Sequence, residues 1–257
     1  MPIYDCCFTG AVGQERKNNE DNFYLNGCYR ENVETASFQV TERCEEGTFA
    51  VFDGMGGAEY GEEASLRAAE ALLPYGNRLM QEQIGEYIRH ANESICSWRR
   101  ENHDVPCGTT VALLSLREDR AICCNLGDSR IYLMRGGALR QLTQEHTLSA
   151  LMVRMGVYED VSCAQVRERH TLTRYLGAYE EESTLSVYYA EPFSVEVGDI
   201  LLLCSDGLTD MVDEPEISSI LCFGGSAEEM AVALREAALT NGGHDNVTVG
   251  IIHRRTV

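Results

Sequence analysis

Short apolar runs, each bounded by glycine or polar residues, recur along the chain. Their length and apolar character are typical of buried β-strands. The runs cover residues 23–25, 48–52, 109–116, 121–125, 130–134, 200–204 and 247–252. We therefore predict a protein whose core is built from β-sheet.

Other stretches carry apolar residues at helical spacing. Residues 61–80 and 82–100 show this pattern, although Pro74 should break or kink the first of them. A further helix is predicted over residues 226–240, because Ser226 and Glu229 have the spacing of a capping box and two glycines follow. Two consecutive helices lie between groups of strands, rather than one helix after each strand. This order favours antiparallel sheets with helices packed outside them.

Length and charge narrow the possible classes of protein. The chain has 257 residues, and no linker or low-complexity tract divides it, so we expect a single domain over residues 1–257. The net charge of −20 repels nucleic acid and anionic membranes, and neither is an expected partner. No apolar run approaches the ~20 residues that span a bilayer, and the first residues do not resemble a signal peptide. We expect a soluble cytoplasmic protein.

The 11 cysteines include no C-x-x-C pair, so the ligand spacing of a zinc knuckle is absent. Several of them, such as Cys123, Cys124 and Cys204, stand inside apolar runs. We interpret these as small buried hydrophobic residues in a reducing compartment.

Acidic residues mark the ends of the predicted strands. Some follow an apolar run and stand beside glycine, and others directly precede a run; they are Glu20, Asp21, Asp53, Asp128, Asp206 and Asp245. In an antiparallel pair, the end of one strand lies beside the start of its neighbour. These acids can therefore gather at one rim of the sheets.

Carboxylates that gather in this way repel one another unless a cation neutralises them. Oxygen ligands favour hard ions such as Mg²⁺ or Mn²⁺ over zinc, and glycines let backbone carbonyls come within ligand range. A single Asp-Gly dipeptide, however, is more often an ordinary β-turn. The residues alone leave a metal site and a set of turns as open alternatives.

Six short motifs follow one another along the chain. They are RKNNEDN at 16–22, DGMGG at 53–57, CGTT at 107–110, GDSR at 127–130, SDGL at 205–208 and DNVT at 245–248. In this order and at these spacings, they resemble the metal-dependent serine/threonine protein phosphatases of the type 2C class, in their compact bacterial form. The resemblance implies an α+β fold: a four-layer αββα sandwich of two antiparallel sheets flanked by helix pairs.

The resemblance also implies a binuclear metal site that holds two divalent cations, Mg²⁺ or Mn²⁺. Asp53 would bridge both metals, and Asp206 and Asp245 would hold the first. Glu20 and the carbonyl of Gly54 would help to hold the second. A water between the metals would attack phosphorus in line with the ester oxygen.

Further roles follow from the same resemblance. Asp21 would orient metal-bound water, and Arg16 would grip the substrate phosphate through a bidentate contact. A third, weaker cation would use Asp128 and Asp206. Met55 stands where some eukaryotic relatives carry histidine, so the leaving group must take its proton from metal-bound water or another residue.

The segment 148–178 corresponds to the flap of this family. It is rich in charged residues, and we expect a short helix pair beside the active site that influences the choice of substrate. His146 precedes the segment and matches a recurrent family position. We interpret it as organising the segment rather than as a catalytic residue.

A cysteine-based phosphatase would need a C-x5-R loop that cradles phosphate. Cys124 and Arg130 have this spacing but enclose the acidic Gly-Asp-Ser motif. Cys163 and Arg169 also have it, but Glu168 lies between them and no glycine shapes the loop. Both are poor candidates.

We therefore predict a monomeric phosphatase that acts on phosphoserine and phosphothreonine in protein substrates of a Ser/Thr kinase. Two alternatives stay open. One is a phosphatase of the same fold with a single dedicated partner, such as a phosphorylated anti-sigma-factor antagonist. The other is a non-catalytic pseudophosphatase or phosphoprotein-binding regulator, which the presence of every expected metal acid disfavours.

Overall fold

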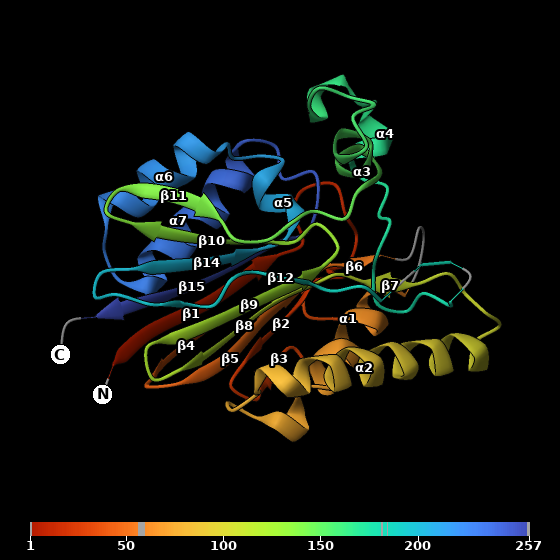
Figure 1. The fold of residues 1–257 in the computed structure, drawn as a ribbon, viewed down its shortest axis with the longest axis horizontal. Helices are drawn as coiled ribbons and strands as arrows, with labels where there is room; N and C mark the ends of the chain where they lie inside the picture. Colours follow the sequence, from red (N-terminus) through yellow and green to blue (C-terminus); the bar gives the residue numbers. More distant parts are fainter. Residues whose placement is uncertain (1, 56–59, 181, 184, 256–257) are drawn as a thin grey trace.

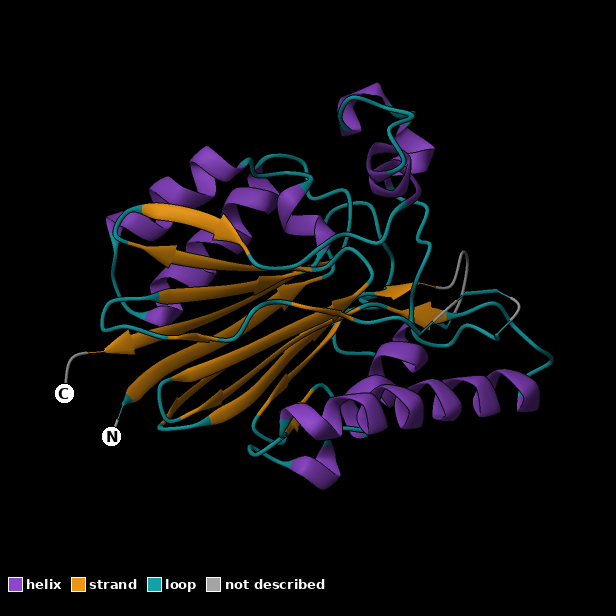
Figure 2. Ribbon diagram, viewed as in Figure 1, coloured by secondary structure: helices purple, strands orange, loops and turns teal. Residues whose placement is uncertain are grey.

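Two antiparallel β-sheets lie face to face, and helices cover their outer faces (Figures 1 and 2). This computed structural model describes residues 2–55, 60–180, 182–183 and 185–255. The first sheet has the strand order β11-β10-β14-β15-β1-β4. Its strands are β1 (Ile3–Ala11), β4 (Ser37–Cys44), β10 (Arg130–Arg135), β11 (Ala138–Gln141), β14 (Ile200–Cys204) and β15 (Val247–Arg255).

The second sheet has the strand order β12-β9-β8-β5-β2-β3, and β13 also pairs with β9. Its strands are β2 (Asn22–Leu25), β3 (Cys28–Tyr29), β5 (Gly47–Phe52), β8 (Val111–Arg117), β9 (Arg120–Leu126), β12 (Tyr188–Tyr189) and β13 (Phe193–Ser194). A separate short pair joins β6 (Gly54–Met55) to β7 (Gly108–Thr109).

Each outer face carries a pair of helices. The helices α1 (Gly61–Glu70) and α2 (Gln81–Glu101), with the 3-10 turn η1 (Leu73–Tyr75), cover the second sheet. The helices α6 (Glu214–Phe223) and α7 (Ala227–Thr240) cover the first. None of the helices in the described parts of the chain combines the length and apolar character needed to cross a membrane. The fold is the predicted αββα sandwich.

The central strands are buried on both faces, which explains why they read as continuous apolar runs. In β14, Leu201 and Leu203 point into the layer between the sheets, whereas Leu202 packs under the helices. In β8, Leu114 lies in the layer between the sheets and Leu113 packs against the other helix pair. Alternate side chains thus fill separate core layers.

Several elements were absent from the sequence prediction, among them β4, β1 and α6. The strand β4 is an edge strand whose exposure alternates along its length and which carries few apolar residues. The strand β1 contains small residues such as Gly10, against which the Phe38 ring packs. The sequence signal for the helix α6 is its N-cap residue Asp213, whose side chain accepts from the backbone N–H of Glu216. None of these elements has a strong periodic apolar pattern.

The predicted helix over 61–80 is shorter in the structure. It ends at Glu70, and the chain turns through η1, in which Pro74 stands near the first position. The predicted strand over 109–116 is likewise divided, because β7 ends at Thr109 and β8 begins at Val111. The break places Thr110 against the site described below.

The layer between the sheets should carry much of the stability. Phe49 is fully buried there, and its ring stacks on that of Phe8 at a centroid distance of 6.4 Å. We expect Phe49→Ala to lower the free energy of unfolding by about 3–5 kcal/mol, because a large cavity would remain. Urea denaturation provides the measurement.

The matched control is Phe223→Ala, because Phe223 is 95% exposed at the end of α6. We expect this variant to stay within about 0.5 kcal/mol of the wild type. Equal losses in the two variants would show that burial between the sheets is not the source of the stability.

Candidate metal centre and active site

The predicted strand-end acids come together at one end of both sheets. The strand β2 pairs with β5 so that Asn22 faces Phe52, which brings the neighbouring Asp21 and Asp53 to the same rim. In the other sheet β14 pairs with β15. Asp206 follows β14 and Asp245 precedes β15 at the corresponding end.

The backbone of Asp53 is held on three sides. Its N–H donates to Thr110 Oγ1 at 2.9 Å. Its carbonyl accepts from the N–H of Thr110 and from Thr109 Oγ1, each at 2.9 Å. Thr110 Oγ1 in turn lies 2.7 Å from Ser129 Oγ, next to Asp128. The CGTT and GDSR motifs therefore fix the strand end from which the Asp53 carboxylate projects.

Asn246 fixes the loop that carries Arg16 and Glu20. Its Nδ2 donates to the carbonyls of Val12 and Asn18, each at 2.9 Å, and its Oδ1 accepts from the N–H of Glu20 at 2.8 Å. The residue is only 4% exposed. The sequence prediction assigned Asn246 no role, although a polar residue directly before a buried strand was the available signal.

Glu20 and Gly54 approach each other so closely that a side chain at Gly54 would not fit. A Cβ there would lie 2.3 Å from the carbonyl oxygens of both Glu20 and Gly61. A Cβ at Gly61 would lie 2.8 Å from Glu20 Oε2 and from the carbonyl carbon of Gly54. The structure thus brings together the Glu20 carboxylate and the Gly54 carbonyl. Gly56 and Gly57 of the same motif lie outside the described residues.

Asp21 lies behind the rim rather than on it. It is 1% exposed, and Ser205 Oγ donates to its carboxylate at 2.8 Å. Burial raises the pKa of Asp21 to about 7, although the neighbouring hydroxyl groups of Thr248 and Ser205 oppose the shift. Its position is that of a residue that orients the groups in front of it.

The acids at the rim are not compensated by equal positive charge. Burial raises the pKa of Asp53 well above its ordinary value, and the neighbouring Asp206 raises it further. The pKa of Asp128 and that of Asp245 are raised by burial and again by Asp206. Burial also acts on Asp206, but the neighbouring His170 imidazole and Asp53 carboxyl group outweigh it and lower the pKa of Asp206.

Such a cluster cannot be fully ionised without bound cations. The donors supplied by Glu20, Gly54, Asp53, Asp206 and Asp245 are all oxygens, which suits Mg²⁺ or Mn²⁺. The residues present therefore fit a pair of hard divalent ions.

The cluster opens into a cleft of about 600 Å³. Asp128, Asp206 and Asp245 line it, as do Arg16 and residues of the segment 148–178. Arg16 is half exposed, and its Nη2 lies 2.6 Å from Asp245 Oδ2. A guanidinium at this position can meet an anion that enters the cleft.

The cysteines of the two C-x5-R pairs are not suited to act as the nucleophile of a phosphatase. Cys124 is 1% exposed within β9, and burial raises the pKa of its thiol to about 12. A protonated thiol is not a nucleophile at neutral pH. Arg169, which would complete the other C-x5-R pair, donates through Nη2 to the carbonyls of Ser162 and Ala164.

Residues 10–247 match the family described as "Protein phosphatase 2C". The chain belongs to the protein phosphatase 2C family. This family is metal-dependent, in agreement with the acids at the rim. The family membership also agrees with the resemblance seen in the six motifs.

Curated relatives in this family include the "Serine/threonine phosphatase stp" of Listeria monocytogenes. It is 32% identical over 252 residues, which cover 94% of this chain and 92% of the relative. "Protein phosphatase PhpP" of Streptococcus pneumoniae is 29% identical over 251 residues, covering 94% of each chain. These matches run through almost the whole sequence.

Solved structures in the same family share the fold. The serine/threonine phosphatase PstP/Ppp of Mycobacterium tuberculosis superposes with a TM-score of 0.82 at 27% identity, covering 99% of this chain and all (100%) of that one. A catalytic domain of PstP in complex with 2 manganese ions has a TM-score of 0.78 at 28% identity and covers 100% of both chains.

His146 forms hydrogen bonds both to the loop beside Asp128 at the rim and to the segment 148–178. It is fully buried, and its Nδ1 accepts from the N–H of Gly127 at 3.1 Å, beside Asp128. Its carbonyl accepts from the N–H of Thr173 at 2.7 Å and from Thr173 Oγ1 at 2.9 Å. These contacts agree with the predicted organising role.

Burial lowers the pKa of His146 to about 4, and Arg174 and Arg154 add to the shift. The unfolded chain takes up a proton near pH 6.5, whereas the folded chain does not. Stability should therefore be lost as the pH falls from 6.5 to 4, by at most about 3 kcal/mol from this group. We expect His146→Gln to remove this part of the pH dependence, measured by urea unfolding across that range.

The control is His90→Gln, because His90 lies exposed on α2. This variant should keep the pH dependence of the wild type. If the His146→Gln and wild-type curves stay parallel between pH 6.5 and 4, burial of a neutral imidazole is not the cause.

Proposed function

We propose that this protein is a serine/threonine protein phosphatase that hydrolyses phosphoserine and phosphothreonine with the aid of two divalent cations. The observation that carries the proposal is the convergence of strand-end acids from both sheets on one cleft. Membership of the protein phosphatase 2C family, and relatives named as serine/threonine phosphatases, support the same reaction.

The proposed roles of the acids are those that the resemblance to the family implies. Asp53 is the proposed bridge, and it is close enough to acids of both sheets that the charges of Asp206 and Asp21 both raise its pKa. Asp206 and Asp245 hold the first cation, and Glu20 with the Gly54 carbonyl holds the second. When bound, the two cations supply a hydroxide-like nucleophile at neutral pH and neutralise charge on the phosphoryl oxygens.

The chain itself positions the substrate. Arg16 orients the phosphate at the mouth of the cleft. A cation bound at Asp245 would compete with Arg16 for the Asp245 carboxylate, and the guanidinium would then be available to the phosphate. Asp21 and Ser205 support the rim from behind. Met55 cannot transfer a proton, so no role in protonating the leaving group falls to it.

Several finer features belong to the same proposal. The resident ions are Mg²⁺ or Mn²⁺, and a third, weaker cation uses Asp128 and Asp206. Residues 1–257 form a single catalytic domain that acts as a cytoplasmic monomer on phosphorylated protein substrates of a Ser/Thr kinase. Neither nucleic acid nor a membrane is a proposed partner. The pseudophosphatase alternative is not favoured, because every expected metal acid lies at the rim.

Release of phosphate from a phosphothreonine peptide and from p-nitrophenyl phosphate tests the reaction. We expect activity with Mn²⁺ that EDTA abolishes. Asp206→Asn should reduce kcat/KM by at least about 100-fold, because one carboxylate of the cluster loses its charge. Asp119→Asn is the control, since Asp119 is exposed in the turn between β8 and β9. Activity that survives in Asp206→Asn, or that appears with no divalent ion, would contradict the proposal.

We propose that the segment 148–178 is a flap that influences substrate choice. It contains two short helices, α3 (Leu148–Arg154) and α4 (Val166–Arg169), which stand away from the sandwich (Figure 1). Val161, Arg169 and His170 of this segment line the cleft.

Replacing residues 148–178 with the corresponding segment of a relative should therefore change the ranking of phosphopeptides by kcat/KM. It should also change the affinity for the third cation. Hydrolysis of p-nitrophenyl phosphate is the control, because this small substrate makes few contacts outside the cleft. An unchanged peptide ranking together with unchanged cation affinity would refute the role of the segment.

A further inference from the structure

Two thiols lie against each other toward the end of the sandwich that is opposite the metal rim. Cys6 on β1 and Cys44 at the end of β4 are both free thiols, with their Sγ atoms 3.8 Å apart. Theirs is the one thiol–thiol hydrogen bond among the described residues. Along β1, Ala11 faces Val247 beside the rim, whereas Cys6 faces Ile252. The pair therefore lies outside the cleft.

The strand register places the two side chains on the same face. The strand β4 pairs with β1 at the edge of the first sheet (Figure 1). Tyr4 faces Cys44 and Cys6 faces Glu42, so the two cysteines are diagonal neighbours. Both reach the apolar layer between the sheets, where Cys6 is buried and Cys44 packs at its margin.

A disulfide between diagonal neighbours needs a small movement of the backbone. Their Cα atoms are typically about 7–8 Å apart, whereas a disulfide joins Cα atoms that are at most about 7 Å apart. The strand β4 is hydrogen-bonded on one side only, and Cys44 is its last residue. The end of an edge strand shifts more readily than a central strand does. The two thiols can therefore come together without disturbing the central strands.

The two thiols differ in how an oxidant meets them. Cys6 is 2% exposed, and burial raises the pKa of its thiol well above the ordinary value. Cys44 is partly exposed, and its hydrogen bond with Cys6 lowers the pKa of its thiol. The thiolate is the form that reacts with peroxides. Cys44 therefore has the properties of the attacking thiol, and Cys6 those of the thiol that resolves the product.

We propose that Cys6 and Cys44 are a reversible oxidation site, at which hydrogen peroxide or an organic hydroperoxide links β1 to β4 through a disulfide. With hydrogen peroxide, the Cys44 thiolate takes one oxygen to become a sulfenic acid, and the O–O bond breaks to release hydroxide. The Cys6 sulfur then attacks the sulfur of the sulfenic acid, and the S–O bond breaks to release water that carries the Cys6 proton. The two thiols lose two electrons in total, and the peroxide gains them. Exchange with a small thiol such as glutathione restores both cysteines.

The link acts on the part of the chain that carries the first motif. The stretch between the two cysteines contains residues 16–22, so the disulfide closes a loop around that motif. The other end of β4 lies beside the motif, because Asn19 Nδ2 donates to the carbonyl of Ala36 at 3.3 Å. The ring of Phe38 in β4 stacks on that of Phe23, at a centroid distance of 4.5 Å. Closing such a loop disfavours unfolding, because it reduces the freedom of the unfolded chain.

Peptide mapping of the peroxide-treated full chain tests the site, with the remaining thiols blocked by N-ethylmaleimide before digestion. Trypsin should release peptide 1–16 joined to peptide 44–67, lighter by two hydrogens than the two thiol peptides together, apart from the label on Cys7. The joined peptide should be absent from Cys6→Ser and Cys44→Ser. Cys7→Ser is the matched control and should keep it, because Cys7 packs on the other face of β1.

Thermal unfolding measures the consequence for the fold. The oxidised wild type should unfold about 5 °C or more above the reduced form, and dithiothreitol should remove the difference. Cys44→Ala should show no such difference, with circular dichroism used to confirm that this variant folds. Hydrogen exchange of the β4 amides should slow on oxidation in the wild type but not in Cys44→Ala. These readouts involve no phosphatase activity, so they stand apart from the proposed function.

The proposal is overturned if the wild type yields no joined peptide, or if the joined peptide persists in Cys6→Ser. It is also overturned if Cys44 joins instead to Cys28, the exposed thiol on β3, or to a second copy of the chain. If the exposed thiol of Cys222 is oxidised before the pair is joined, the pair has no special reactivity and the proposal fails. A joined peptide with an unchanged unfolding temperature and unchanged exchange would refute the fastening of β4.

Discussion

Mutual repulsion among carboxylates buried at one end of the sandwich is the constraint on which the rest of the structure depends. Asp53, Asp206 and Asp245 could separate if their backbones were free to move, and the cluster would then lose its affinity for cations. Their backbones are not free, because each stands at the end or start of a strand buried on both faces. The two sheets thus supply the rigidity that opposes the repulsion.

Uncharged groups do the local positioning. Thr110 binds the backbone of Asp53, and Asn246 binds the backbone of Glu20. These contacts use peptide groups and leave carboxylate oxygens available to a cation. Gly54 contributes in another way, since the absence of a side chain lets two loops approach closely enough for its carbonyl to join the Glu20 carboxylate. The motifs therefore fix the backbone at the rim as well as supplying candidate metal ligands.

The parts of this arrangement that follow from local patterns could be predicted from the sequence. The buried strands follow from their apolar runs, and the shared rim follows from antiparallel pairing of strand ends. The strand β4 could not be predicted, because an edge strand needs only a weak alternating pattern. Asn246 was missed because its partners, Val12 and Asn18, lie at the other end of the chain. Local patterns carry no information about such contacts.

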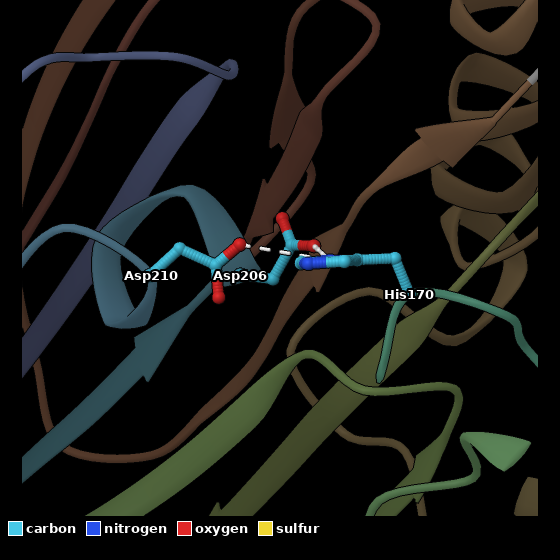
Figure 3. A group of neighbouring side chains, drawn as sticks. All are labelled: His170, Asp206 and Asp210. Atoms are coloured by element: carbon cyan, nitrogen blue, oxygen red, sulfur yellow. Dashed lines mark ion pairs between the residues drawn. The ribbon is translucent and has the colours of Figure 1, made fainter. Parts of the chain in front are cut away.

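Two histidines, His146 just before the segment 148–178 and His170 within it, illustrate the same limit. His146 lies fully buried at its base, where contacts with Gly127 and Thr173 hold it in one arrangement. His170 lies beside the same base, since the carbonyl of the next residue, Thr171, accepts from the N–H of Leu148 at 2.8 Å. Its side chain is 47% exposed and faces the carboxylates of Asp206 and Asp210 across the cleft (Figure 3). The two imidazoles therefore connect the base of the segment to the rim from two directions, one through Gly127 beside Asp128 and the other through the start of α5 (Asp206–Thr209). Because both connections meet at this base, the position of the segment depends on the same carboxylates that form the rim.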